Sequence, residues 1–92
     1  MAKNITLIQA REMQAGGALL LDVRSAEEYQ KEHMEGSISV PVERLAERIA
    51  AITGVAGRGR RLLLYCSTGS RSRIAAQLLQ RLGYTKIYII MV

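Results

Sequence analysis

The only cysteine of the chain, Cys66, follows the apolar run "LLLY" (62–65) and precedes a short polar loop. The loop consists of small residues followed by an arginine: Ser67, Thr68, Gly69, Ser70 and Arg71. Small side chains let successive backbone amides point inward and form an anion-binding nest. A helix is predicted to begin at about Ser70 or Arg71, so its free N–H groups and positive dipole end would also face the loop.

A cysteine at the rim of such a nest is expected to have a lowered pKa, because the loop stabilises the thiolate. The thiolate is the nucleophilic form, so Cys66 is predicted to react without a histidine base. The alternative is an inert buried thiol, since free cysteine is among the most buried residue types. The position at a strand end, before a small-residue loop and a helix, favours the reactive interpretation.

The elements that would position Cys66 can be predicted from apolar patterns. Continuous apolar runs at 18–23 and 61–65 are typical of strands covered on both faces. Further short strands are predicted at 5–6, 37–40 and 86–90. Helical patterns fill the intervals at 7–15, 25–33, 42–52 and 71–82, with a glycine-rich loop at 53–59.

Two local signals sharpen the helix predictions. Ser25 and Glu28 form a capping box, which marks the start of a helix expected to run to about His33. The last helix carries an apolar stripe that is expected to face the core: Ile74, Ala75, Leu78, Leu79 and Leu82.

Alternating strands and helices predict an α/β fold with a mainly parallel sheet of four to five strands and helices on both faces. The 92 residues allow one domain, 1–92, with its core at 18–90. Ligand sites of such sheets lie beyond the carboxyl ends of the strands, where Cys66 is expected. Asp22 and Arg24 end their strand at the same edge. They are expected to form a structural ion pair or hydrogen bond, with support of the substrate as the alternative.

The composition of the chain indicates which classes of ligand and partner are expected. The formal net charge of +5 favours anionic ligands. The basic run at 57–61 is short and no aromatic platform accompanies it, so nucleic acid is not expected. One cysteine cannot form an internal disulfide, and Cys66 with His33 cannot supply the four ligands of a structural zinc site.

The sequence also bears on the location of the protein. No apolar run approaches the roughly 20 residues of a membrane span, so no membrane is expected. The start of the sequence does not follow the pattern of a signal peptide. A cytoplasmic location is therefore expected, and a periplasmic one stays open if a signal peptide had been removed.

The segments "LLLDVRSAEEYQKEHMEGSISVP" and "LLLYCSTGSRSRIAAQLLQRLGYTKIYII" together resemble a single-domain rhodanese, a thiosulfate sulfurtransferase, over roughly residues 18–90. The resemblance implies that Cys66 attacks the outer sulfur of thiosulfate, releases sulfite and keeps a persulfide held by the amides of 67–71. Cyanide, a thiol or a redox protein would then accept the sulfur. The resemblance implies no metal and no organic cofactor.

Three other functions remain open. Phosphatases that share this fold place five residues between cysteine and arginine, whereas Arg71 here comes after four and the sixth position is Ser72. The shorter loop favours sulfur over phosphate as the transferred group. A sulfur carrier that loads Cys66 for a protein partner is the main alternative. Rhodanese-like domains without the cysteine serve as interaction modules, which the presence of Cys66 disfavours.

Several residues near the motifs have alternative roles. Arg71 is expected to brace the loop through a carboxylate, with contact between its side chain and the anionic donor as the alternative. Arg73 is expected to be a solvated helix residue. His33 matches a family histidine that is usually structural. Family members usually continue past the last strand into a turn and a further helix, which this sequence lacks. That absence favours exposed apolar surface and self-association through the C-terminal region.

Overall fold

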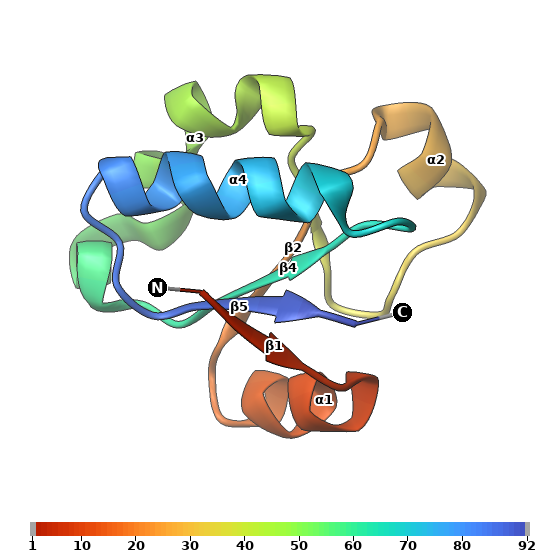
Figure 1. Ribbon diagram of the computed structural model, residues 1–92, viewed down its shortest axis with the longest axis horizontal. Helices are drawn as coiled ribbons and strands as arrows, with labels where there is room; N and C mark the ends of the chain where they lie inside the picture. The colour runs from red at the N-terminus through yellow and green to blue at the C-terminus, as the bar shows by residue number, and fades with distance from the viewer. Residues whose placement is uncertain (1, 92) are drawn as a thin grey trace.

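The computed structural model describes residues 2–91. Its elements alternate along the chain (Figure 1) in the order β1 (Lys3–Ile5), α1 (Leu7–Ala15), β2 (Leu19–Asp22), α2 (Ala26–Lys31), β3 (Ile38–Ser39), the 3-10 helix η1 (Val42–Arg44), α3 (Leu45–Thr53), the 3-10 helix η2 (Gly54–Gly59), β4 (Leu62–Tyr65), α4 (Ser70–Arg81) and β5 (Ile87–Ile90). Among the residues that the structure describes, no helix has the length and apolar character needed to cross a membrane.

The five strands form one sheet in the order β1-β5-β4-β2-β3, and every pair of neighbours is parallel. β4 lies in the middle, with Leu64 opposite Leu21 on one side and Ile89 on the other. Helix α1 covers one face of the sheet, and α3 and α4 cover the other (Figure 1). The predicted α/β fold with a parallel sheet and helices on both faces is therefore confirmed.

The apolar run of β4 is continuous because both faces of this strand are covered. Leu62 and Leu64 pack with the residues of α3 and α4, whereas Leu63 packs with those of α1. All three side chains are fully buried, and each contributes roughly 1.5–3 kcal/mol to stability by leaving water. This burial fixes the central strand β4, and it therefore also fixes the position of Cys66, which follows the strand.

Two predicted features of the helices are wrong. Helix α2 ends at Lys31 instead of near His33, because Glu32 is extended (φ −164°, ψ 149°) and its carbonyl accepts a hydrogen bond from Arg24. Ile74, predicted to face the core, is 57% exposed. Helix α4 packs on the sheet through smaller residues nearby, Ala75 and Ala76, which turns Ile74 toward solvent.

One predicted loop and one predicted helix differ in detail. The glycine-rich segment 53–59 contains the short helix η2, which is broken at Gly57 (φ 57°, ψ −137°). The helical pattern that begins at Val42 starts as η1 and becomes α-helical at Leu45. The strand boundaries otherwise lie within about two residues of their predicted positions.

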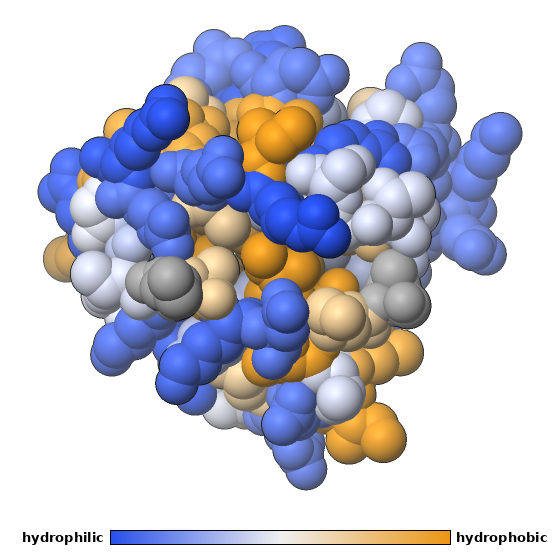
Figure 2. Space-filling view, in the orientation of Figure 1, coloured by the Kyte–Doolittle hydropathy of each residue, from blue (hydrophilic) through white to orange (hydrophobic). Residues whose placement is uncertain are grey.

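Apolar side chains gather in the middle of the face shown in Figure 2 and continue toward its lower right, with hydrophilic residues around them. The large apolar side chains that are exposed include Ile8, Ile74 and Met91. The expected self-association through the C-terminal region stays a prediction.

Candidate active site

Cys66 comes directly after β4 and is fully buried at the carboxyl edge of the sheet. The chain then turns through Ser67 and Thr68 into Gly69, the residue that precedes helix α4. Gly69 has φ 84° and ψ −17°, a left-handed conformation that glycine adopts without steric cost. A Cβ atom at this position would meet nothing closer than Nη2 of Arg73, at 3.8 Å. Glycine is therefore favoured here for its backbone angle and not for space.

The Cys66 sulfur accepts two backbone hydrogen bonds. The Gly69 N–H donates to Sγ at 2.9 Å and the Ser72 N–H donates at 3.4 Å. Burial by itself raises the pKa of the thiol, but the hydroxyl and amide of Ser72 and the amides of Thr68 and Gly69 outweigh it. The pKa of Cys66 therefore lies below the ordinary value for a thiol, which favours the thiolate.

Ser72 was not among the residues that the sequence predicted for the site. It is the third residue of α4, and the first four N–H groups of a helix have no partner inside the helix. The predicted start of the helix at about Ser70 was thus the signal that could have identified the Ser72 amide. The Ser72 hydroxyl is also fully buried, and its oxygen has no hydrogen-bond partner among the described residues.

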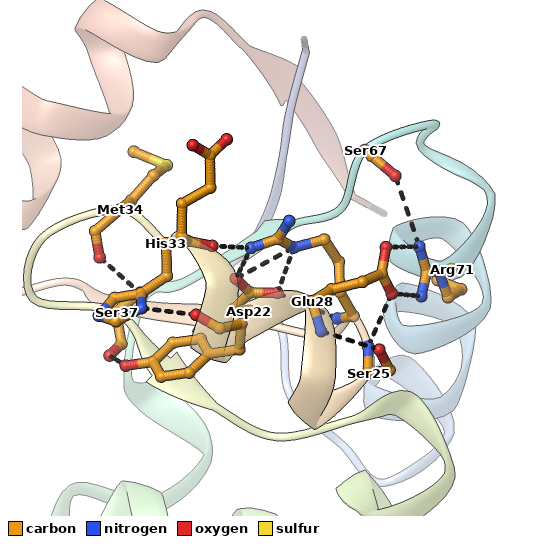
Figure 3. Close-up of polar contacts among 11 residues, drawn as sticks. Asp22, Ser25, Glu28, His33, Met34, Ser37, Ser67 and Arg71 are labelled. Atoms are coloured by element: carbon orange, nitrogen blue, oxygen red, sulfur yellow. Dashed lines mark hydrogen bonds and ion pairs between the residues drawn. The ribbon is translucent and has the colours of Figure 1, made fainter.

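Arg71 is tied to a carboxylate on another helix (Figure 3). Its guanidinium donates to Glu28 through Nη1–Oε1 at 2.6 Å and Nη2–Oε2 at 3.1 Å, and to Ser67 Oγ at 3.4 Å. Both charged side chains are about one-third exposed. This geometry matches the predicted brace, because Arg71 connects the Cys66 loop and α4 to α2.

Glu28 has a second role at the start of α2. The predicted capping box is present: the Glu28 amide donates to Ser25 Oγ at 3.2 Å, and the Ser25 amide donates to Glu28 Oε1 at 3.0 Å. The Arg71 guanidinium and then the Ser25 amide lower the pKa of Glu28 to about 2. The carboxylate of Glu28 therefore remains charged. It connects the first turn of α2 to Arg71, which braces the Cys66 loop.

Asp22 and Arg24 form a buried ion pair at the end of β2 (Figure 3). Arg24 Nη2 lies 2.8 Å from Asp22 Oδ2 and Nε lies 3.0 Å from Oδ1. Arg24 Nη2 also donates to the Glu32 carbonyl, and its Cζ atom lies 5.0 Å from the ring centroid of Tyr65. These contacts are the structural ion pair that the sequence predicted, placed beside the residue that precedes Cys66.

His33 and Arg73 line two different pockets. His33 Nδ1 lies 2.8 Å from the Tyr29 carbonyl oxygen, and the two rings stack with centroids 3.8 Å apart. Arg73 is exposed and, with Thr68 and Gly69, lines a pocket of about 130 Å³. The other lining residues come from β1 and the end of β5: Asn4, Ile89, Ile90 and Met91.

The sequence matches a known protein family whose fold agrees with the one described above. Residues 6–91 match the family model of the rhodanese-like domain. The chain belongs to this family. The resemblance predicted from the sequence is thereby confirmed.

Relatives of this rhodanese-like domain include sulfurtransferases. It is 39% identical over 67 residues to thiosulfate sulfurtransferase PspE of Escherichia coli strain K12, a match that covers 73% of this chain and 62% of PspE. It is 31% identical over 86 residues to thiosulfate sulfurtransferase GlpE of Pseudomonas savastanoi, covering 94% of this chain and 77% of GlpE. The chain thus spans less than two-thirds of the length of PspE.

A solved structure supports the same family. The human single-domain sulfurtransferase TSTD1 is similar to this rhodanese-like domain with a TM-score of 0.81 and 29% sequence identity. The similarity covers 98% of this chain and 89% of the human protein.

Proposed function

We propose that this rhodanese-like domain is a sulfurtransferase that carries sulfane sulfur as a persulfide on Cys66. The observation that carries the proposal is the sulfur of Cys66, which is buried at a strand end and accepts hydrogen bonds from the Gly69 and Ser72 amides. The lowered pKa of Cys66 supplies the nucleophilic thiolate. The names of the relatives PspE and GlpE support thiosulfate as the donor.

The first half of the reaction loads the cysteine. The Cys66 thiolate attacks the outer sulfur of thiosulfate, and a bond forms between Sγ and that sulfur. The S–S bond of thiosulfate breaks, and its electron pair leaves with sulfite. The transferred sulfur, now the outer atom of the persulfide, carries the negative charge, which we expect the loop amides to stabilise.

The second half discharges the cysteine. An acceptor such as cyanide or a thiolate attacks the outer sulfur, the bond to Sγ breaks, and its electron pair returns to Sγ as the thiolate. Arg71 is held by Glu28 and therefore fixes the loop. The exposed Arg73, in the pocket beside the loop, supplies a cation for an anionic donor.

Intact-mass analysis after treatment with thiosulfate tests the proposal, with Cys66→Ala as the control. We expect wild type to gain one sulfur atom that a reductant removes, and the variant to gain none. Repeated formation of thiocyanate from thiosulfate and cyanide is then expected. A wild-type protein without reducible sulfur would refute the proposal, and loading without turnover would favour the sulfur carrier. Hydrolysis of an aryl phosphate would favour the phosphatase.

A further inference from the structure

The hydroxyl of Ser72 is a buried polar group without a hydrogen bond. Its side chain is 0% exposed, and Oγ has no partner among the described residues. Other shielded hydroxyls do have partners: Thr53 donates to the Ile49 carbonyl at 3.1 Å and Ser37 to the Met34 carbonyl at 2.6 Å. Leaving a buried hydroxyl unsatisfied is costly, so the exception needs an explanation.

The explanation lies next to the Cys66 sulfur. The Ser72 amide donates to Sγ at 3.4 Å, so the first turn of α4, which carries the Ser72 side chain, lies against that atom. The hydroxyl is close enough to contribute to the lowered pKa of Cys66, although it makes no hydrogen bond of regular geometry. A neutral thiol is a weak acceptor, whereas an ionised acceptor forms the stronger, charge-assisted hydrogen bond.

We propose that Ser72 is a catalytic residue whose hydroxyl donates a hydrogen bond to Cys66 Sγ when that sulfur carries negative charge. The inference rests on the proposed function, because it assigns Ser72 to one half of that reaction. Loading removes charge from Sγ, since the negative charge of the persulfide lies on its outer sulfur. Discharge returns an electron pair to Sγ as the acceptor takes the outer sulfur.

The two halves of the reaction should therefore respond differently. In discharge, the Ser72 hydroxyl stabilises the leaving thiolate in the transition state but not in the persulfide, so it accelerates this step. In loading, the same hydrogen bond stabilises the attacking thiolate. It raises the fraction of thiolate near neutral pH but lowers its intrinsic nucleophilicity.

Ser72→Ala tests this difference in single-turnover reactions. Wild type and variant are loaded with thiosulfate, the persulfide is quantified by intact mass, and thiocyanate is followed after addition of excess cyanide. We expect discharge to slow by roughly 10- to 100-fold, the factor for loss of a hydrogen bond to a charged group. Loading at about pH 10, where an ordinary thiol is ionised, should be unchanged or faster. Loading at pH 7 should be slower, and the pH profile of alkylation by iodoacetamide should shift upward.

Two variants separate chemistry from packing. Ser72→Thr keeps the hydroxyl and is expected to discharge like wild type. Thr53→Val removes a buried hydroxyl that has partners, so it should lower the melting temperature and leave discharge unchanged. Ser72→Ala, which removes an unpartnered hydroxyl, should leave the melting temperature unchanged or raise it.

The outcomes distinguish this inference from the function on which it rests. If wild type gains no sulfur, the proposed function fails. If wild type loads and Ser72→Ala discharges at the wild-type rate, the role of Ser72 is overturned while the function stands. Equally slow discharge in Ser72→Ala and Ser72→Thr would assign the effect to packing and would also overturn that role.

Discussion

Replacement of Gly69 by alanine tests the link between the backbone of the loop and the reactivity of Cys66. The added Cβ atom would meet Nη2 of Arg73 at 3.8 Å, an ordinary van der Waals contact, so no clash is expected. The cost arises from φ 84°, because a left-handed conformation costs a residue with a Cβ atom about 1–2 kcal/mol. In a domain of this size, each kcal/mol lowers the melting temperature by roughly 4–8 °C. We therefore expect a decrease of roughly 4–16 °C.

The same substitution should raise the pKa of Cys66. The loop of the variant relieves its strain by moving away from positive φ, which takes the Gly69 amide from its position 2.9 Å from Sγ. This movement costs the neutral thiol little, but it deprives the thiolate of a charge-assisted hydrogen bond. Relaxation therefore favours the protonated form. The change is measured by thermal unfolding and by the rate of iodoacetamide alkylation across pH.

Gly83→Ala is the matched control for Gly69→Ala. Gly83 also has a positive φ, of 94°, and its Cβ would lie 2.7 Å from Cδ of Arg58, whose side chain would have to move. This variant should lose stability without any change in the titration of Cys66. Gly69→Asn should recover much of the stability, because asparagine tolerates the left-handed region better than alanine. The reasoning is refuted if Gly69→Ala melts like wild type, or if it loses stability while Cys66 titrates as before.

Two further predictions concern the charged groups around the loop. The pKa of Glu28 is lowered from 4.5 to about 2, so its ion pair with Arg71 stabilises the folded state above pH 4.5, and this contribution is lost as the pH falls toward 2. In urea unfolding between pH 2 and 6, the free energy of unfolding should depend less on pH for Glu28→Gln than for wild type. An equal dependence on pH in the two proteins would contradict the brace. Asp22→Asn leaves the buried Arg24 without its counter-ion and should lower the free energy of unfolding by about 3–5 kcal/mol. A loss below about 1 kcal/mol in urea unfolding at pH 7, the size of an exposed ion pair, would show that Arg24 does not depend on Asp22.

The elements that depend on local sequence could be predicted well. The apolar run of β4 reflects burial on both faces, and the capping box fixes the start of α2 through contacts only three residues apart. Cys66 and its loop were identified for the same reason, because a strand end, small residues and a helix start are contiguous in the chain. In the structure, the Gly69 amide donates a hydrogen bond to the Cys66 sulfur, as an anion-binding loop requires.

Features that depend on distant segments could not be predicted. The sequence favoured a carboxylate partner for Arg71 but gave no means of selecting Glu28, which lies on another helix. The end of α2 is set by the hydrogen bond from Arg24 to the Glu32 carbonyl, and no local pattern encodes it. Ile74 belongs to a periodic apolar stripe, yet the closeness of Ala75 and Ala76 to the sheet decides which residues of α4 are buried.

The position of β1 in the sheet has a consequence for the order of folding. β1 lies at the edge, and its neighbour is β5, with Lys3 opposite Tyr88. Contacts between residues so far apart in the sequence require closure of nearly the whole chain, which slows their formation. β5 is also the last strand of the described chain to be synthesised, whereas β2 and β4 can pair before it is made. The first of these strands to be synthesised is therefore expected to be the last to join the sheet.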